Sequence, residues 1–285
     1  MRLGQLHSSG IAAYYDNLSA FLAFARWFGR GGGSQQGATH RFLAGEADDT
    51  PAPEQLDLLV LEAAIKAGLA SAPRVLDAGC GIGGTVFRWR ERVQGLYDGL
   101  TLSPEQRRRA EAEAIRRGVT EYCRFHLRSY HDPIAGSYDA AIAIESLAHS
   151  PNPTTAVANL AAALAPGGLL LIVDDMPAGP VESNMLARFK ACWRCPVLAD
   201  ATNFRAAIAA AGLTLQHEDD LTSRLRPRAL PALKVLIAGF GLARRLAPTR
   251  RLRDVLDAVL GGFLLEALYR LGAMRYGLIV AVKLR

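Results

Sequence analysis

The fold of this chain is decided by residues 75–84, which read Val75-Leu76-Asp77-Ala78-Gly79-Cys80-Gly81-Ile82-Gly83-Gly84. The run from Arg74 to Asp77 has the length of a short buried strand, and a helical stretch from Thr85 to Val93 follows the glycines. Glycine lets the backbone approach a ligand closely, and the first turn of a helix offers N–H groups without intrahelical partners. The order of strand, turn and helix therefore predicts a ligand-binding loop.

Strand and helix patterns alternate over residues 70–175, which we expect to form the core of the fold. Beyond the first strand, apolar runs suited to strands occur at Leu96–Leu102, Cys123–Tyr130, Tyr138–Glu145 and Leu169–Val173. Because helical stretches separate these runs, consecutive strands must lie parallel in one sheet.

The helix after the second strand carries its own start and stop signals. Ser103 stands at the N-cap, Pro104 at the first helical position, and Gln106 is placed to reach back to the cap. Gly118 marks the end of this helix. The agreement of these signals supports the alternating pattern.

The flanking regions complete the predicted architecture. Residues 1–69 are expected to form an N-terminal helical lid, with an aromatic-rich helix and a second helix at Pro51–Lys66. Residues 176–285 are expected to hold the rest of the core, because helical stretches at about 229–243 and 252–271 precede a last apolar strand. We therefore predict an α/β fold: a seven-stranded, mostly parallel sheet flanked by helices, with N-terminal helices and a helical substrate cap inserted before the last strand.

Composition indicates a folded protein of a reducing compartment. The 285 residues carry 33 basic and 27 acidic side chains, and the arginines are scattered rather than arranged in one stripe, so nucleic-acid binding is not expected. Cys192-Trp193-Arg194-Cys195 lacks a second cysteine pair, so no metal site is expected. No secretory signal or uninterrupted apolar run of about twenty residues appears, which predicts a cytoplasmic protein without a transmembrane span.

The spacing Gly79-x-Gly81-x-x-Gly84 also fits the pattern of dinucleotide-binding loops. Asp77 argues against that ligand, because a carboxylate beside the loop would repel a pyrophosphate, whereas a cationic sulfonium with an amino-acid ammonium group would be attracted. A nicotinamide-dependent oxidoreductase is therefore a remote alternative.

Residues Val75 to Gly83 resemble the first motif of class I S-adenosylmethionine-dependent methyltransferases, and the similarity extends over about residues 70–175. The resemblance implies a Rossmann-like sheet and S-adenosylmethionine as cofactor, with S-adenosylhomocysteine as its product. It also implies cofactor-binding roles for residues of the loop. These are Asp77, Gly79, Cys80, Gly81 and Gly83.

The end of the second strand narrows the resemblance. Most family members hold the ribose with an acidic residue there, but this chain has Thr101 within the pattern Gly-x-Thr-x-Ser-x-x-Gln. That form is similar to the subgroup that includes tocopherol, prenyl diphosphate, natural-product sugar and cyclopropane-synthase-like methyltransferases. It implies further cofactor contacts after the second, third and fourth strands. They are assigned to Thr101, Leu102, Ser103, Gln106, Ser129, Tyr130 and Glu145.

Catalytic candidates follow the fourth and fifth strands. Ligands on open parallel sheets bind beyond the carboxyl ends of the strands, so Glu145 and His149 should flank the transferred methyl group. Asp174, after the fifth strand, and Tyr15 are further candidates. In similar natural-product O-methyltransferases a histidine occupies the position of Ala148 here, and this difference favours C-methylation slightly over O-methylation.

The aromatic N-terminal stretch and the apolar segments of the cap predict a hydrophobic acceptor, isoprenoid-like or another specialised metabolite. Arginines 224, 226 and 228 precede the main cap helix, and five more follow it between residues 244 and 253. They are interpreted as a clasp for a diphosphate, a solvated face or a surface for peripheral contact with an anionic membrane. A cofactor-binding cyclase or pseudoenzyme of the same fold is the main alternative, and both a monomer and a homodimer stay open.

Overall fold

The computed structural model describes residues 52–179 and 184–284. Most of the predicted N-terminal lid, with the catalytic candidate Tyr15, lies outside the described residues. Within residues 52–179 and 184–284, no helix combines the length and the apolar character needed to cross a membrane.

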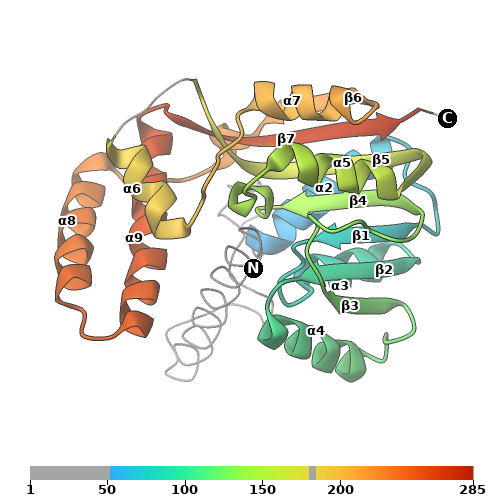
Figure 1. Cartoon of the computed structure of the whole chain (residues 1–285), viewed down its shortest axis with the longest axis horizontal. Coiled ribbons are helices and arrows are strands. Elements are labelled where there is room, and N and C mark those ends of the chain that lie inside the picture. The colour runs from blue at the N-terminus through green and yellow to red at the C-terminus, as the bar shows by residue number, and fades with distance from the viewer. Residues whose placement is uncertain (1–51, 180–183, 285) are drawn as a thin grey trace.

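One seven-stranded sheet forms the centre of the described structure (Figure 1). Its strands run in the order β3-β2-β1-β4-β5-β7-β6, with β1 to β5 parallel and β7 antiparallel to both of its neighbours. In chain order they are β1 (Arg74–Ala78), β2 (Leu96–Thr101), β3 (Cys123–Leu127), β4 (Tyr138–Ile144), β5 (Leu164–Pro177), β6 (Leu213–Asp220) and β7 (Met274–Lys283). The predicted fold class is confirmed.

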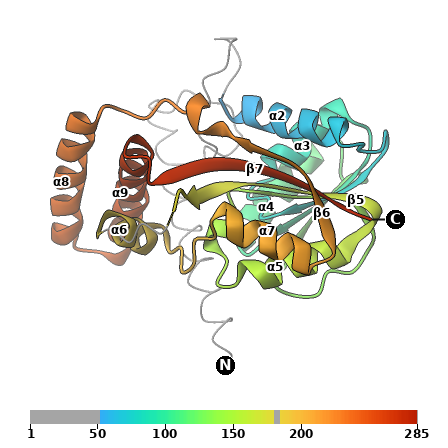
Figure 2. The same ribbon diagram turned by 90° about the horizontal axis from the view of Figure 1, so that it is seen from above.

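Helices cover both faces of this sheet, because successive side chains of each strand point to opposite faces. Val75 of β1 belongs to a core cluster with α2, α3 and α4, whereas Leu76 belongs to a second cluster with α5 and α7. Figure 2 shows these layers from above. The covering helices are α2 (Ala52–Lys66), α3 (Gly84–Arg92), α4 (Pro104–Arg117), α5 (Pro153–Ala163) and α7 (Ala201–Ala210).

A helical cap stands at one end of the sheet, at the left of Figure 1. It consists of α6 (Asn184–Trp193), α8 (Leu230–Leu246) and α9 (Arg250–Arg270). The α8–α9 hairpin enters before β7, as predicted, and α6 joins it from the connection between β5 and β6. Trp193 of α6 packs against α9 in two ways. Its ring lies so close to Gly261 that a Cβ there would be 2.1 Å from the ring, and its indole N–H donates to the carbonyl oxygen of Ala258 over 2.9 Å.

Two details of the core differ from the sequence prediction. The fifth strand begins at Leu164 rather than Leu169, because the segment through Gly168 pairs with β4 across a register shift. Gly168 is needed there, since a Cβ would lie 2.9 Å from the carbonyl oxygen of Tyr138. The third strand ends at Leu127, so Ser129 and Tyr130 belong to the following loop.

Candidate active site

A cavity opens at the carboxyl ends of β1, β2 and β4, where a doubly wound sheet places its ligands. Its wall comes from the glycine loop, the first turns of α3 and α4, the loop after β3 and the short 3₁₀ turn η1 (Leu147–His149) with the residues before it. The described residues that line it are Asp77, Gly79, Cys80, Gly81, Ile82, Gly84, Thr85, Arg88, Leu100, Thr101, Leu102, Ser103, Gln106, Arg128, Tyr130, Ile144, Glu145, Ser146 and His149.

Three glycines of the loop take left-handed backbone angles, but they serve different purposes. Gly81, at φ +55°, leaves open space where a side chain would stand. Gly79, at φ +99°, packs so closely that a Cβ would lie 2.5 Å from the Cβ of Ser146. Gly83 faces the core instead of the cavity, since a Cβ there would lie 2.8 Å from the ring of Phe125. Gly83 is therefore not among the residues that line the cavity, and its contact with the cofactor stays a prediction.

Asp77 is the acidic residue of the loop, and only 3% of its surface is exposed. It lies at the end of β1 and lines the cavity together with the thiol of Cys80. Burial, with the negative charge of Asp77, raises the pKa of the Cys80 thiol well above its ordinary value. The loop thus presents a carboxylate and a neutral thiol.

The end of β2 is held by a local network. The Thr101 hydroxyl donates to Gln106 Oε1 over 2.8 Å and accepts from the Ser103 N–H over 3.2 Å. Ser103 Oγ accepts from the Gln106 N–H over 3.0 Å and so caps α4 as predicted. The side chain of Gln106 bonds Thr101 rather than reaching back to the cap, because the threonine hydroxyl already satisfies the Ser103 N–H.

The loop after β3 brings two of its side chains to the cavity. Tyr130 lines the wall and donates its hydroxyl to the carbonyl oxygen of Ser146 over 2.9 Å. Arg128 lines it too, whereas Ser129 does not and instead accepts from the His131 N–H over 3.0 Å. Of the predicted pair, the structure therefore brings only Tyr130 to the cavity.

Glu145 occupies the turn directly after β4 in a strained conformation. Its φ is +51°, which a residue with a Cβ adopts only when the surroundings require it. Its N–H donates to Val173 O over 2.8 Å, and its carboxylate accepts from the hydroxyl of Tyr276 over 2.9 Å. Tyr276 comes from β7, is fully buried and was not predicted from the sequence. The strain and these contacts fix the Glu145 carboxylate on the cavity wall.

Asp174 lies behind that wall rather than in it. Its carboxylate accepts from the N–H of Ala148 over 2.9 Å and from that of Asp175 over 2.8 Å. Burial, followed by the charge of Asp175, raises the pKa of Asp174 to about 8. Asp175 is in turn bonded by the hydroxyl of Tyr269 from α9. Through its hydrogen bond with the N–H of Ala148, Asp174 stabilises the η1 turn.

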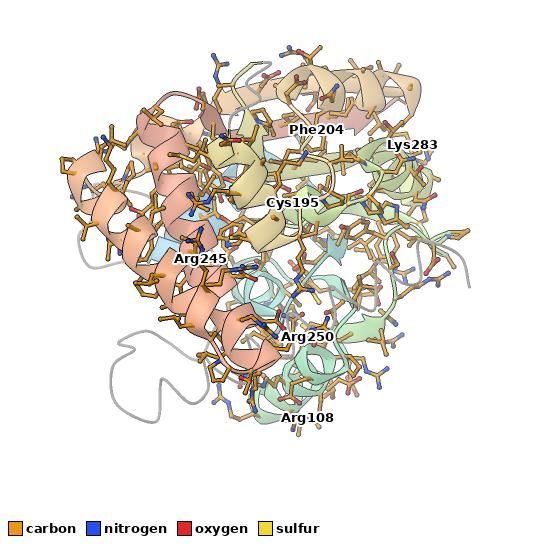
Figure 3. The ribbon with its side chains drawn as sticks, turned by 60° about the vertical axis from the view of Figure 1, so that its left-hand side comes forward. Arg108, Cys195, Phe204, Arg245, Arg250 and Lys283 are labelled. Atoms are coloured by element: carbon orange, nitrogen blue, oxygen red, sulfur yellow. The ribbon has the colours of Figure 1, made fainter. Side chains whose placement is uncertain are left out.

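His149 ends this turn and lines the cavity. Its Nδ1 lies 3.9 Å from the sulfur of Cys195, which follows α6, so the turn touches the segment that leads out of the cap. Cys195 is 1% exposed, and Figure 3 labels it beside α6.

A buried ion pair between α2 and α3 lies next to the cavity and was not predicted from the sequence. Asp57 of α2 bonds the guanidinium of Arg88 and accepts from the Thr85 hydroxyl over 2.8 Å. The carbonyl oxygen of Asp57 accepts from the indole N–H of Trp89 over 3.0 Å. The sequence did contain a sign of this pair. Asp57 is a single acid on an otherwise apolar face of α2, and Thr85 and Arg88 are polar residues one helical turn apart on α3.

A seven-stranded sheet of this order, with a glycine loop after β1 and an acidic residue before it, defines the class I methyltransferase fold that the first motif predicted. The profile of a family described as a methyltransferase domain matches residues 46–218. The chain belongs to this family, and the recognition made from the sequence is confirmed.

Among curated relatives, an O-methyltransferase (cnsE) of Penicillium expansum is 30% identical over 178 residues. This match covers 60% of the present chain and 63% of the relative, so the chain spans less than two thirds of that relative's length.

Solved structures resemble the fold over nearly the whole chain. The [4+2]-cyclase SpnF matches with a TM-score of 0.73 and 22% identity, covering 96% of this chain and 95% of the cyclase. A geranyl diphosphate C-methyltransferase from Streptomyces coelicolor A3(2), in complex with Mg²⁺, geranyl diphosphate and S-adenosylhomocysteine, matches with a TM-score of 0.67 and 16% identity over 98% of both chains. At these identities the likeness concerns the fold.

Proposed function

We propose that this protein transfers the methyl group of S-adenosylmethionine to a hydrophobic small molecule. The observation that carries the proposal is the glycine loop, in which the open left-handed Gly81 lies next to the buried carboxylate of Asp77 on one cavity wall. A cavity that combines backbone access with a buried negative charge suits a ligand that carries an ammonium and a sulfonium group.

The residues of the β1–β2 side are suited to hold this cofactor. Asp77 and the loop at Gly79 and Gly81 would contact its amino-acid portion, and Thr101 with Gln106 would meet the ribose through hydrogen bonds. Tyr130 and Leu102 provide apolar surface for the adenine. When bound, the cofactor supplies an electrophilic methyl group on a positively charged sulfur.

The β4 side is suited to the acceptor. Glu145 is held on the cavity wall by Tyr276, so its carboxylate is oriented before any ligand arrives. A carboxylate in this position can stabilise a developing cation on a methylated alkene or accept the proton that a C–H or O–H acceptor loses. Ile144 at the end of β4 adds apolar wall on this side, which suits an isoprenoid-like or similarly hydrophobic acceptor. With alanine at position 148, we favour C-methylation.

The proposal for the cofactor is tested by calorimetry. We expect the protein to bind S-adenosylmethionine and S-adenosylhomocysteine, and Asp77→Ala to weaken binding of S-adenosylmethionine at least about tenfold, as loss of one charge-assisted contact implies. The exposed Asp219→Ala on β6 is the matched control and should bind normally. Binding of NADH without S-adenosylmethionine would overturn the proposal.

The acceptor is tested by incubating the protein with prenyl diphosphates, quinols and polyketides and searching for the mass gain of one methyl group. With an accepted substrate, Glu145→Gln should lower kcat by roughly 10²- to 10⁴-fold, the range for loss of a general base. Tyr276→Phe should lower kcat less and leave the affinity for S-adenosylmethionine unchanged. Equal loss of cofactor binding in both variants would show that Glu145 serves the cofactor pocket alone.

A further inference from the structure

The outer face of α8 carries an apolar stripe that none of the described residues covers. Pro231, Val235, Ala238, Leu242 and Leu246 are all exposed and recur at helical spacing, so they lie along one side of the helix. Val235 and Leu246 each have 72% of their surface exposed. At 1.5 Å per residue, the stripe extends over roughly 23 Å.

The opposite side of α8 already has its packing partner. Leu233 and Ile237 are buried there, and the ring of Phe240 meets that of Phe263 on α9 with centroids 5.3 Å apart. Figure 2 shows α8 as the outermost element, with α9 between it and the sheet. The stripe is therefore additional to the apolar surface that the fold needs from this helix.

Basic side chains flank the stripe, and most of them have no acidic partner among the described residues. Residues 230–253 contain six basic side chains and no Asp or Glu. Arg244 bonds Asp257 of α9, whereas the other five are exposed and form no ion pair with the described residues. Arg245 near the end of α8 and Arg250 at the start of α9 are labelled on this hairpin in Figure 3. The five cations are Lys234, Arg245, Arg250, Arg251 and Arg253.

We propose that this face of the α8–α9 hairpin docks on the surface of an anionic lipid bilayer. An interfacial helix lies in the plane of the membrane with its apolar side among the acyl chains and its basic side chains at the headgroups. The exposed stripe of α8 with its flanking cations has the apolar side and the basic side chains that such a helix needs. Arginine and lysine bury their aliphatic stems while their charged ends stay in water, so the flanking cations add contact area as well as charge. Leu252, 42% exposed between Arg251 and Arg253, extends the apolar surface around the turn.

Charge complementarity selects this occupant over a second copy of the chain. In a two-fold symmetric dimer the same patch would meet itself, and the unpaired cations would face one another across the interface. An anionic leaflet instead attracts each cation, contributing about fivefold in binding per side chain near the surface. This docking does not depend on which acceptor the cavity takes.

The test measures co-flotation of the full chain with phosphatidylcholine vesicles that contain or lack phosphatidylserine. We expect binding to the anionic vesicles, weakened by salt, and little binding to neutral ones. Leu242→Asn with Leu246→Asn should reduce binding about a hundredfold, because two leucines no longer enter the bilayer. Arg250→Ser with Arg251→Ser should reduce it roughly 25-fold.

Ile115→Asn with Arg124→Ser is the matched control, since Ile115 is 70% exposed on α4 and Arg124 is exposed on β3. Unchanged cofactor binding shows that each variant is folded. The proposal is overturned by failure of the wild type to bind anionic vesicles, or by an equal loss in the control variant. It is also overturned if the wild type does not bind vesicles and is a dimer in sedimentation, whereas the double leucine variant is a monomer.

Discussion

The two sides of the cavity are built in different ways. On the β1–β2 side the wall consists of backbone turns and side chains close in sequence, such as Thr101, Ser103 and Gln106, which bond one another. On the β4–β5 side two carboxylates, those of Glu145 and Asp175, are each held by a tyrosine far along the chain. Tyr276 lies 131 residues from Glu145, and Tyr269 lies 94 residues from Asp175. The first side is thus a local construction, and the second depends on the cap and the strand that follows it.

The largest effect is expected where the β1–β2 side rests on α2. Asp57→Ala leaves the buried guanidinium of Arg88 without its carboxylate and removes the acceptor of the Thr85 hydroxyl. We expect a loss of about 3–5 kcal/mol in the free energy of unfolding, measured by urea denaturation. A loss below about 1 kcal/mol would mean that the glycine loop does not rely on this pair.

The second prediction concerns the point at which the two sides touch. Gly79→Ala brings a Cβ against Ser146 and forces a left-handed residue, so we expect a loss of about 2–3 kcal/mol in stability and weaker binding of S-adenosylmethionine. Ser146→Gly in the same chain should restore part of the loss.

Gly118→Ala is the control for backbone strain alone, because Gly118 also has a positive φ, of +67°, but open space around it. It should cost about 1 kcal/mol and leave cofactor binding unchanged. Equal effects at both glycines would show that contact between the two sides is unimportant.

The third prediction uses the titration of Asp174. Its pKa in the folded protein is raised to about 8, so folding favours the protonated form, and this contribution to stability is lost as the pH rises from the ordinary value near 4 towards 8. Asp174→Asn cannot ionise. The stability of the variant relative to wild type should therefore rise with pH, by about 1.4 kcal/mol per unit at most, apart from a constant offset for the lost acceptor. Thermal unfolding at several pH values checks this, and parallel curves would contradict it.

The smallest effect on stability is expected at the exposed ion pair that Glu105 forms with Arg108 and Arg109 on α4, on the β1–β2 side. Hydrogen bonds from Arg108 and Arg109 lower the pKa of Glu105 to about 2. The resulting stability is present above the ordinary pKa and is lost as the pH falls through about 2. Because the pair is exposed to solvent, Glu105→Gln should cost only about 0.5 kcal/mol at neutral pH. A cost as large as that of Asp57→Ala would remove the distinction between buried and surface pairs.

The same difference explains what could be predicted from the sequence. The alternation of strands and helices, the glycine loop and the Ser103 cap of α4 depend on patterns within short stretches of sequence, and these features were predicted. The conformation of Gly83 against Phe125 depends on a packing partner that no local pattern specifies. Tyr276 appeared only as part of an apolar strand, because its contact with Glu145 requires the register of β7 in the finished sheet. The roles assigned to the site residues stay predictions.

The position of β7 has a consequence for the order in which the protein is assembled. It lies between β5 and β6 in the sheet but follows both in the sequence. During synthesis on a ribosome, β6 therefore emerges with no strand to join, and the space beside β5 stays open until the α8–α9 hairpin has been made. Insertion of β7 then completes the sheet, because β7 pairs with β5 on one side and with β6 on the other. The same step brings Tyr276 into contact with Glu145. A nascent chain that stops short of β7 would contain the glycine loop but would lack the tyrosine that orients the Glu145 carboxylate.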